Sequence, residues 1–429
     1  MREKLKNLLI LLLGLLMIAQ LMVNLALGLG EDTLQTLRMR LGMDTRPDST
    51  QTAFAESVLR PGKLAVRGPD GLYLACGSEV DGLLGTVSPI LSEALGSVGK
   101  ITSIENRDFL QMLSDPHIAF SFSYPVPFYL LQHWWTGETG FSSDQSATTL
   151  VILSVEEKVV LAFCDDSSGK YYLAETAAGY DRFVSLCQAA PNSNAFYAFE
   201  RDGYHMLRAH EPVWSTPVYY PTYTVTLPDF SEEGVISEDL LSAFDINHFL
   251  AEVYKESDGD IVYIEGYNAL QFSKDGHVVY SVTGDGGIEL DLSDGMAEKE
   301  RRAYVSRQIC EILERIAVAA GCDGGFSIAG ISAENNGYVI TCERSLGGGF
   351  ITEKDGYSAV VTIEEEKITG IRMTLSTTSE SGTAMLLPLQ LATALLEGKD
   401  NSFCVRYIEQ DGQMIPKLYS MGGMYHGME

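Results

Sequence analysis

The sequence lacks the short motifs that carry most enzyme chemistry. Its seven histidines show neither the HExxH nor the HxxxH spacing of a zinc site. The chain also contains no GxSxG nucleophile elbow and no P-loop. Its stretches GDGG and GGG do not stand between a strand and a helix, as a nucleotide-binding loop requires. We therefore expect no enzyme, with no catalytic, cofactor-binding or metal-binding residues.

Closely spaced cysteine pairs are missing as well. No CxxC pair exists among the seven cysteines, which excludes a zinc knuckle and a thioredoxin-like redox motif. Most of them lie in apolar strings such as VVLAFC and YVITC, where a buried thiol acts as a small hydrophobe. No cysteine precedes Cys76, so the sequence does not support a lipid-modified N-terminus.

Basic residues are scarce. Beyond residue 30 the chain holds 57 of its 58 acidic residues but only 27 of its 30 lysines and arginines, a formal charge of −30. Such a surface repels nucleic acid and anionic lipid headgroups, so we expect neither as a partner. A solvated surface, or attraction to a cationic face of another protein, accounts for the charge.

One long apolar run stands out at the N-terminus. Leu8–Leu29 follows three basic residues and spans 22 residues, about 33 Å as a helix, which is enough to cross a hydrocarbon core of about 30 Å. Basic flanks stay on the cytoplasmic side. The pattern predicts an uncleaved, single-pass anchor with a cytoplasmic N-terminus and the bulk of the chain outside the cell membrane. A cleavable signal peptide ending near Ala26-Leu27-Gly28 is the alternative.

Two amides interrupt the apolar run. Gln20 and Asn24 are four residues apart and therefore share one helical face. An amide near the middle of a bilayer usually faces another helix, so Gln20 and Asn24 are candidate partner-binding residues. The alternative is that the membrane helix simply tolerates both side chains.

The remainder of the chain predicts a multi-domain α+β protein of antiparallel sheets with helices. At roughly 100–200 residues per domain, about 400 residues correspond to two or three domains. We expect an anchor at 1–30, a juxtamembrane linker at 31–60, an N-terminal α+β domain at 61–230, a small central α+β domain at 231–297 and a C-terminal α+β domain at 298–429.

Local patterns place several elements. The segment 211–230 contains four prolines and is interpreted as an extended connector rather than a central strand. Ser237 is a predicted N-cap of a short helix. Val305, Ile309, Ile312, Leu313, Ile316 and Ala320 form one apolar stripe of a helix that Gly321 closes.

Two groups of residues resemble functional sites, but their spacing favours a structural role. The aromatic residues at 124–135 offer a ligand shelf or a partner hot spot, yet their spacing with Leu130 and Leu131 is more typical of a core. Asp258, Asp260 and Asp275 do not follow the spacing of a calcium-binding loop, so turn and surface roles account for them better.

Longer segments resemble a known family. The segment ENRDFLQMLSDPHIAFSFSYPVPFYLL at 105–131 is similar to a stretch of the YycH proteins of Gram-positive bacteria, in which a helix leads into a strand and then a hydrophobic helix. The segments at 261–281 and 356–371, the PLQLATALL helix and the MIPKLY strand resemble the second and third domains of YycH, and the C-terminal part also resembles YycI. The resemblance covers nearly the whole chain. The last strand departs from the family pattern, with Pro416-Lys417-Leu418 where proline, a small residue and tryptophan are expected.

This resemblance implies a regulator rather than an enzyme. YycH and YycI proteins associate with each other and with the WalK sensor histidine kinase, and they set its activity in the two-component system that controls cell-wall homeostasis. The implied partners are therefore a sensor kinase and a YycI-like protein, contacted through the membrane helix and the ectodomain. An extracytoplasmic binding module for a cell-wall fragment or peptide, without catalysis, is the alternative, and a hydrolase with an unrecognised site is a third.

Overall fold

The structure is a computed structural model. It describes residues 58–137, 145–230, 236–292, 295–334, 337–353, 356–386, 389–393 and 401–420. The chain divides into two compact units, Met1–Asp48 and Ser49–Glu429, and all described residues belong to the second. The predicted anchor and its amides Gln20 and Asn24 lie outside the described residues. Within the described residues, no helix combines the length and the apolar character that crossing a membrane requires.

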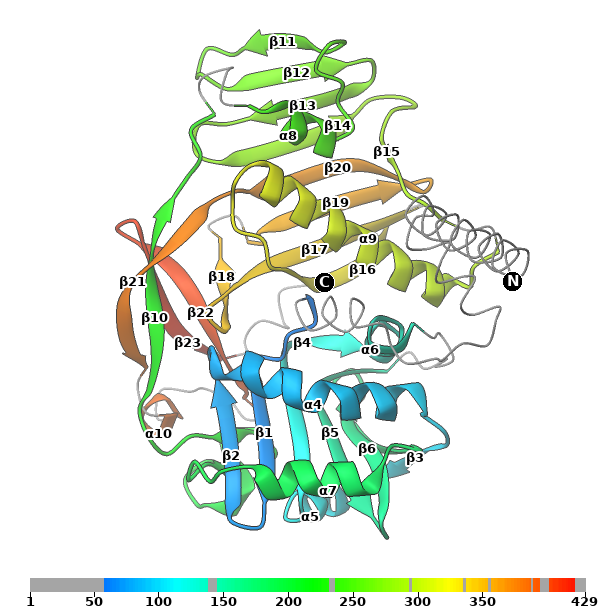
Figure 1. The fold of residues 1–429 in the computed structure, drawn as a ribbon, viewed down its shortest axis with the longest axis vertical. Coiled ribbons are helices and arrows are strands. Elements are labelled where there is room, and N and C mark those ends of the chain that lie inside the picture. Colours follow the sequence, from blue (N-terminus) through cyan, green and yellow to red (C-terminus); the bar gives the residue numbers. More distant parts are fainter. Residues whose placement is uncertain are drawn as a thin grey trace, which may run out of the picture. The chain divides into compact units, whose positions relative to one another are not determined.

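A seven-stranded antiparallel sheet forms the first half of this unit (Figure 1). Its strand order is β2-β1-β4-β5-β6-β7-β3. The strands are β1 (Lys63–Gly68), β2 (Gly71–Cys76), β3 (Ile101–Ile104), β4 (His117–Pro127), β5 (Ser146–Val155), β6 (Lys158–Asp165) and β7 (Lys170–Glu175). The β1–β2 hairpin turns at Pro69-Asp70, between the paired residues Gly68 and Gly71.

Helices cover both faces of this first sheet. The helices α4 (Glu79–Gly96), α6 (Phe128–Thr136) and α7 (Tyr180–Ala189) pack on one face and share a core with alternate residues of β1, β4, β5 and β6. On the other face lie α5 (Asn106–Met112), the short strands β8 (Phe196–Tyr197) and β9 (Pro212–Val213), and the 3-10 helix η1 (Ala198–Glu200). The first sheet is thus buried on both sides, which explains the continuous apolar runs of β5 and β6.

A longer sheet occupies the rest of the unit. It begins with β11 (Glu252–Lys255), β12 (Ile261–Glu265), β13 (Asn268–Phe272) and β14 (His277–Val282), and β14 pairs with β20 (Lys367–Thr374). It continues through β19 (Ala359–Glu364) and β17 (Gly337–Leu346), with β15 (Ile288–Glu289) beside β20 and β16 (Phe326–Glu334) beside β17. The segments predicted as a central and a C-terminal domain therefore contribute to one continuous sheet.

Two helices lie on one face of this longer sheet. The short helix α8 (Glu238–Ala243) begins as predicted at Ser237, whose Oγ accepts a hydrogen bond of 3.1 Å from the N–H of Leu240. The long helix α9 (Glu298–Ala319) carries the predicted apolar stripe, and the stripe packs on the sheet. A face beside the stripe includes Ala303 and Cys310, which belong to the core of the first sheet. Helix α9 is therefore buried between the two sheets (Figure 1).

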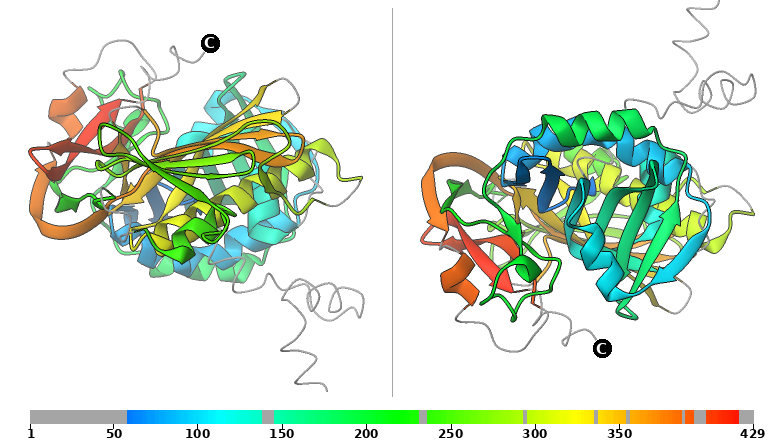
Figure 2. Two further views of the ribbon diagram at one scale, coloured as in Figure 1. Left: turned by 90° about the horizontal axis from the view of Figure 1, so that it is seen from above. Right: turned by 90° about the horizontal axis from the view of Figure 1, so that it is seen from below.

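The last strands extend the longer sheet beyond β17. They are β18 (Gly349–Thr352), β22 (Phe403–Gln410), β23 (Gln413–Ser420), β10 (Val218–Thr226) and β21 (Thr377–Leu386), with the helix α10 (Leu389–Thr393) between β21 and β22. Strands β22 and β23 form a hairpin that turns at Asp411-Gly412. Figure 2 shows the orange β21 curving beside the red β22 and β23.

The prediction that residues 211–230 form only a connector is wrong. Val218–Thr226 is strand β10, which pairs along its length with β21 and, at Tyr223 and Thr224, with β23. The carbonyl of Pro221 accepts a bond of 3.0 Å from the hydroxyl of Tyr407, so the backbone polar groups of Pro221 face away from β21. Since β23 pairs with β10 only at Tyr223 and Thr224, the missing N–H of Pro221 removes no ladder bond. Proline is thus tolerated because the strand is locally an edge.

Candidate partner-binding surface

Exposed large apolar side chains gather on one part of the molecule. Ten such residues are exposed among the described residues, and six of them lie between positions 249 and 267. We call these six the β11 surface: Phe249, Leu250, Val253, Tyr254, Ile264 and Tyr267. Phe249 and Leu250 are 82% and 68% exposed, whereas large apolar side chains are usually buried in a globular protein. An apolar cluster of this kind marks an interaction site more often than scattered surface residues do.

The strand at the centre of this surface is an edge strand. Within the described chain, β11 pairs with β12 alone, and all four of its residues are exposed. The N–H of Glu256 donates to the carbonyl of Asp260 at 2.8 Å, which closes the turn between the two strands. Because hydrogen-bonded pairs alternate along an antiparallel ladder, Glu252 and Tyr254 face β12 with their backbone groups. The N–H and C=O of Val253 therefore point toward the open edge.

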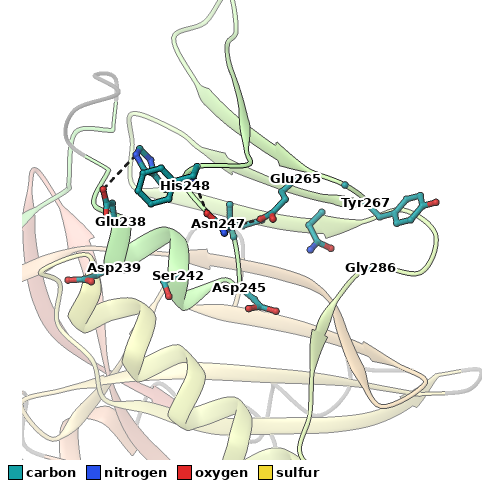
Figure 3. A pocket seen from close by; sticks show the side chains of 13 residues that line it. Glu238, Asp239, Ser242, Asp245, Asn247, His248, Glu265, Tyr267 and Gly286 are labelled. Carbon is teal, nitrogen blue, oxygen red and sulfur yellow. Dashed lines mark hydrogen bonds and ion pairs between the residues drawn. The ribbon is translucent and has the colours of Figure 1, made fainter.

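A hollow of about 800 Å³ opens beside the β11 surface (Figure 3). It lies between α8 with the turn that follows it and the hairpin of β12 and β13. Glu238, Asp239 and Asp245 line one side and Glu265 lines the other, with Phe249 and Tyr267 among the lining residues. The hollow is thus acidic, with aromatic side chains in its wall.

Local hydrogen bonds fix the shape of this hollow. Glu265 Oε2 accepts a bond of 2.6 Å from the N–H of Asn247, and Asn247 Oδ1 accepts one of 3.0 Å from the N–H of Phe249. His248 Nε2 lies 3.6 Å from Glu238 Oε1, and its ring meets that of Phe249 edge to face at 5.0 Å. These contacts hold the aromatic ring of Phe249 at the surface rather than in the core.

The charge around the β11 surface has one sign. Residues 237–268 contain eight carboxylates and one cationic side chain, Lys255, besides His248. A cationic partner segment would gain long-range attraction toward this surface, whereas an acidic one would be repelled.

Three carboxylates next to β11 come close together. The side-chain oxygens of Glu256, Asp258 and Asp260 all lie within 4.8 Å of one another, the arrangement of a cation site. Asp260 Oδ2, however, accepts hydrogen bonds from Gln271 Nε2 at 2.9 Å and from Ser273 Oγ at 2.6 Å. Glu256 and Asp258 are exposed at the turn. The turn between β11 and β12 brings the three carboxylates together, and its hydrogen bonds tie Asp260 to β13 and the residue after it.

The aromatic residues at 124–135 are mostly core, as the sequence favoured. Phe128, Trp134 and Trp135 of α6 are buried in the core that α6 shares with the first sheet, α4 and α9. Trp134 Nε1 donates a hydrogen bond of 3.1 Å to the carbonyl of Ala303 in α9. These rings therefore join two parts of the unit and do not form a ligand shelf.

Buried thiols and imidazoles in the described chain are held neutral. Burial raises the pKa of the Cys76 and Cys187 thiols to about 12. Burial lowers the pKa of His117 to about 3 and that of His210 to about 4. His117 Nδ1 donates to the carbonyl of Asp115 at 2.8 Å, which leaves Nε2 to accept from the hydroxyl of Tyr197 at 2.6 Å. A thiol that stays protonated is a poor nucleophile, so these groups act as packing residues.

Two buried ion pairs were not predicted from the sequence. Lys63 Nζ contacts Glu211 Oε1, and the other oxygen of Glu211 accepts a bond of 2.6 Å from Ser402 Oγ. Arg406 Nη1 lies 2.9 Å from Glu343 Oε1, and Nη2 of the same arginine donates to the hydroxyl of Tyr124. Both groups connect the first sheet with the last strands. Their partners are 63 to 282 residues apart in sequence, so no local pattern signals them.

Known proteins match this chain at the level of structure. No family profile and no curated protein matches its sequence. The crystal structure of YycH from Bacillus subtilis superposes with a TM-score of 0.51 and 10% sequence identity, and the match covers 87% of this chain and 98% of that one. The α+β architecture expected from the resemblance is thus confirmed. The chain has the fold of YycH from Bacillus subtilis.

Proposed function

We propose that this protein is a membrane-anchored, extracytoplasmic regulator that modulates a WalK-type sensor histidine kinase through protein contacts and without catalysis. The observation that carries the proposal is the YycH fold, which extends over 87% of the chain. The predicted anchor, the acidic ectodomain and the exposed β11 surface support a role in binding proteins. A YycI-like protein is the second partner that the family resemblance suggests.

The mechanism of such a regulator follows from binding thermodynamics. A regulator shifts the kinase between two signalling states only if it binds one of them more tightly. The membrane helix is one place for that contact, because Gln20 and Asn24 present two amides on one face. The ectodomain supplies a second place outside the bilayer.

The test is affinity purification of the tagged, full-length protein from crosslinked native membranes. A version with an unrelated anchor helix, whose ectodomain is unchanged, serves as the control. Recovery of a sensor kinase with the native protein, together with altered kinase output when the protein is deleted, supports the proposal. Recovery of no kinase with either version, from cells in which the kinase is present, contradicts it and favours an external ligand.

The two amides give a sharper prediction. Polar contacts between membrane helices average about 0.6 kcal/mol each, so replacing Gln20 and Asn24 with leucine is expected to weaken kinase association by about sevenfold. Replacing Leu12 and Leu16 with isoleucine is the matched control in the same run and leaves association unchanged. Equal kinase recovery from all three versions would show that the amides take no part.

A further inference from the structure

We infer that the β11 surface is a docking site for an extended segment of a partner protein that is rich in lysine or arginine and in large apolar residues. The inference rests on the proposed function, in that it names the kind of partner segment the ectodomain contacts outside the membrane. It concerns a site distinct from the predicted membrane helix.

The apolar side chains supply the first argument. Phe249, Leu250 and Tyr267 are each more than half exposed. Val253 points to one face of the edge and Tyr254 and Ile264 point to the other, so apolar side chains lie on both faces of the edge strand. Large aromatic residues dominate the binding energy of protein interfaces once they are desolvated. Leaving these six apolar residues, three of them aromatic, in water costs hydrophobic free energy that a partner recovers.

The open edge of the sheet supplies the second argument. Strand β11 has one neighbour in the described chain, and the backbone groups of Val253 point away from that neighbour. An extended segment can add to such an edge with main-chain hydrogen bonds, while its alternate side chains contact the apolar residues. The strand has four residues, so the added segment is short.

Charge decides which kind of segment fits. Glu238, Asp239, Asp245 and Glu265 line the adjoining hollow, and Glu252 flanks the edge (Figure 3). Lysine or arginine side chains of the partner reach these carboxylates, whereas a second copy of this chain would place eight carboxylates against eight. The surface therefore favours a basic partner over self-association.

The experiment selects ligands without assuming their sequence. A displayed library of random twelve-residue peptides is panned on the full-length protein in lipid nanodiscs, with empty nanodiscs as the counter-selection. We expect enriched peptides that combine lysine or arginine with large apolar residues and that lack proline in their centre, because proline cannot complete an added strand. Enrichment of acidic peptides, or no enrichment over empty nanodiscs, overturns the inference.

Two exposed apolar residues provide a matched pair of variants. Phe249→Ser removes the most exposed ring of the surface, and Val318→Ser changes a 72% exposed residue on α9, so neither is expected to disturb folding. The selected peptides should bind Phe249→Ser at least tenfold more weakly and Val318→Ser as tightly as the unmodified protein. Equal loss in both variants, or none in Phe249→Ser, overturns the inference.

Two further measurements separate charge from self-association. Asp239→Lys should weaken the selected peptides several-fold, whereas Asp202→Lys, an exposed acid elsewhere, should not. A dimer of the unmodified protein that Phe249→Ser dissociates would show that a second copy occupies the surface and would overturn the inference. Kinase recovery through the native anchor is measured independently. The peptide selection can therefore fail while the proposed function stands, and kinase recovery can fail while the peptide selection succeeds.

Discussion

Two buried histidines make the free energy of unfolding of this protein depend on pH. His117 and His210 are buried, and burial disfavours their charged forms. Their folded-state pKa values, about 3 and about 4, lie below the value of about 6.5 expected in the unfolded chain. At a pH between the folded-state and unfolded-state pKa values, the unfolded chain binds more protons than the folded protein. The free energy of unfolding therefore falls as the pH falls through this range. Above about pH 6.5 both states carry neutral histidines, and these two residues no longer lower the free energy of unfolding.

The variant His210→Phe tests this effect at one site. The ring of His210 meets Phe109 edge to face at 5.7 Å, and phenylalanine preserves that aromatic packing. Between about pH 6 and 4.5, the slope of the unfolding free energy against pH should decrease by about 1.4 kcal/mol per pH unit. This is the slope expected when the unfolded chain binds one proton more than the folded protein. Guanidinium unfolding of the full-length protein, followed by tryptophan fluorescence, measures the slope.

His205→Phe is the control for this comparison, because His205 is exposed. It should leave the slope unchanged. If His210→Phe and His205→Phe gave the same slope as the unmodified protein, the buried imidazole would not be the group that titrates.

Helix α9 shows how one element serves two cores. Its predicted stripe, which includes Ile309 and Leu313, packs on the longer sheet. Ala303, Ser306 and Cys310 are also fully buried, on the side that meets α6. Small residues let the two helices approach closely, because a larger side chain there has no space to occupy. The helix is thus buried on two sides although only one carries large apolar residues.

Ala303→Leu tests the close contact between α6 and α9. Overpacking of a filled core costs about 1–3 kcal/mol, and the added side chain also disturbs the bond from Trp134 Nε1 to the carbonyl of residue 303. Guanidinium unfolding should show this loss. Val318→Leu adds one methylene at an exposed position of the same helix and should change stability by less than about 0.5 kcal/mol. Equal midpoints for the two variants would contradict a packed interface at Ala303.

At the scale of the whole molecule, the described unit is held together by contacts between distant segments. Strand β14 pairs with β20, and the buried core of the longer sheet combines residues from before and after the predicted boundary at residue 297. Around the ion pairs Lys63–Glu211 and Arg406–Glu343, hydrogen bonds from Ser402 to Glu211 and from Arg406 to Tyr124 add buried connections between the first sheet and the last strands. Breaking a buried pair by removing one partner typically costs several kcal/mol, so these links strongly couple the parts.

The predicted central domain at 231–297 can be tested by itself. Its buried residues share a core with Ile309, Leu313 and Ile371, which lie outside that range. We therefore expect the isolated fragment 231–297 to remain unfolded, with poorly dispersed amide resonances. The fragment 230–376, which contains the whole of that core, is the comparison and should show greater dispersion. A dispersed spectrum of the fragment 231–297 would contradict this expectation.

Local chemistry along the sequence determined much of this protein. The charge, the apolar run before residue 30, the N-cap at Ser237, the stripe of α9 and the terminal hairpin follow from neighbouring residues, since helix and hairpin signals are short-range. The full length of helix α4 is not evident from the sequence, because Gly82, Gly85 and Pro89 weaken its helical pattern. The weakly patterned strands β16, β18 and β21 were not predicted either.

The tertiary structure alone decided what the sequence left open. Strand β10 forms despite its prolines because β21 and β23 pair with it, and α9 acquires its second buried face from α6. Strand β11 at the centre of the β11 surface is exposed because the sheet ends there and no described element covers it. Which strand becomes an edge depends on contacts between residues far apart in the chain, and those contacts leave no periodic signal in the sequence.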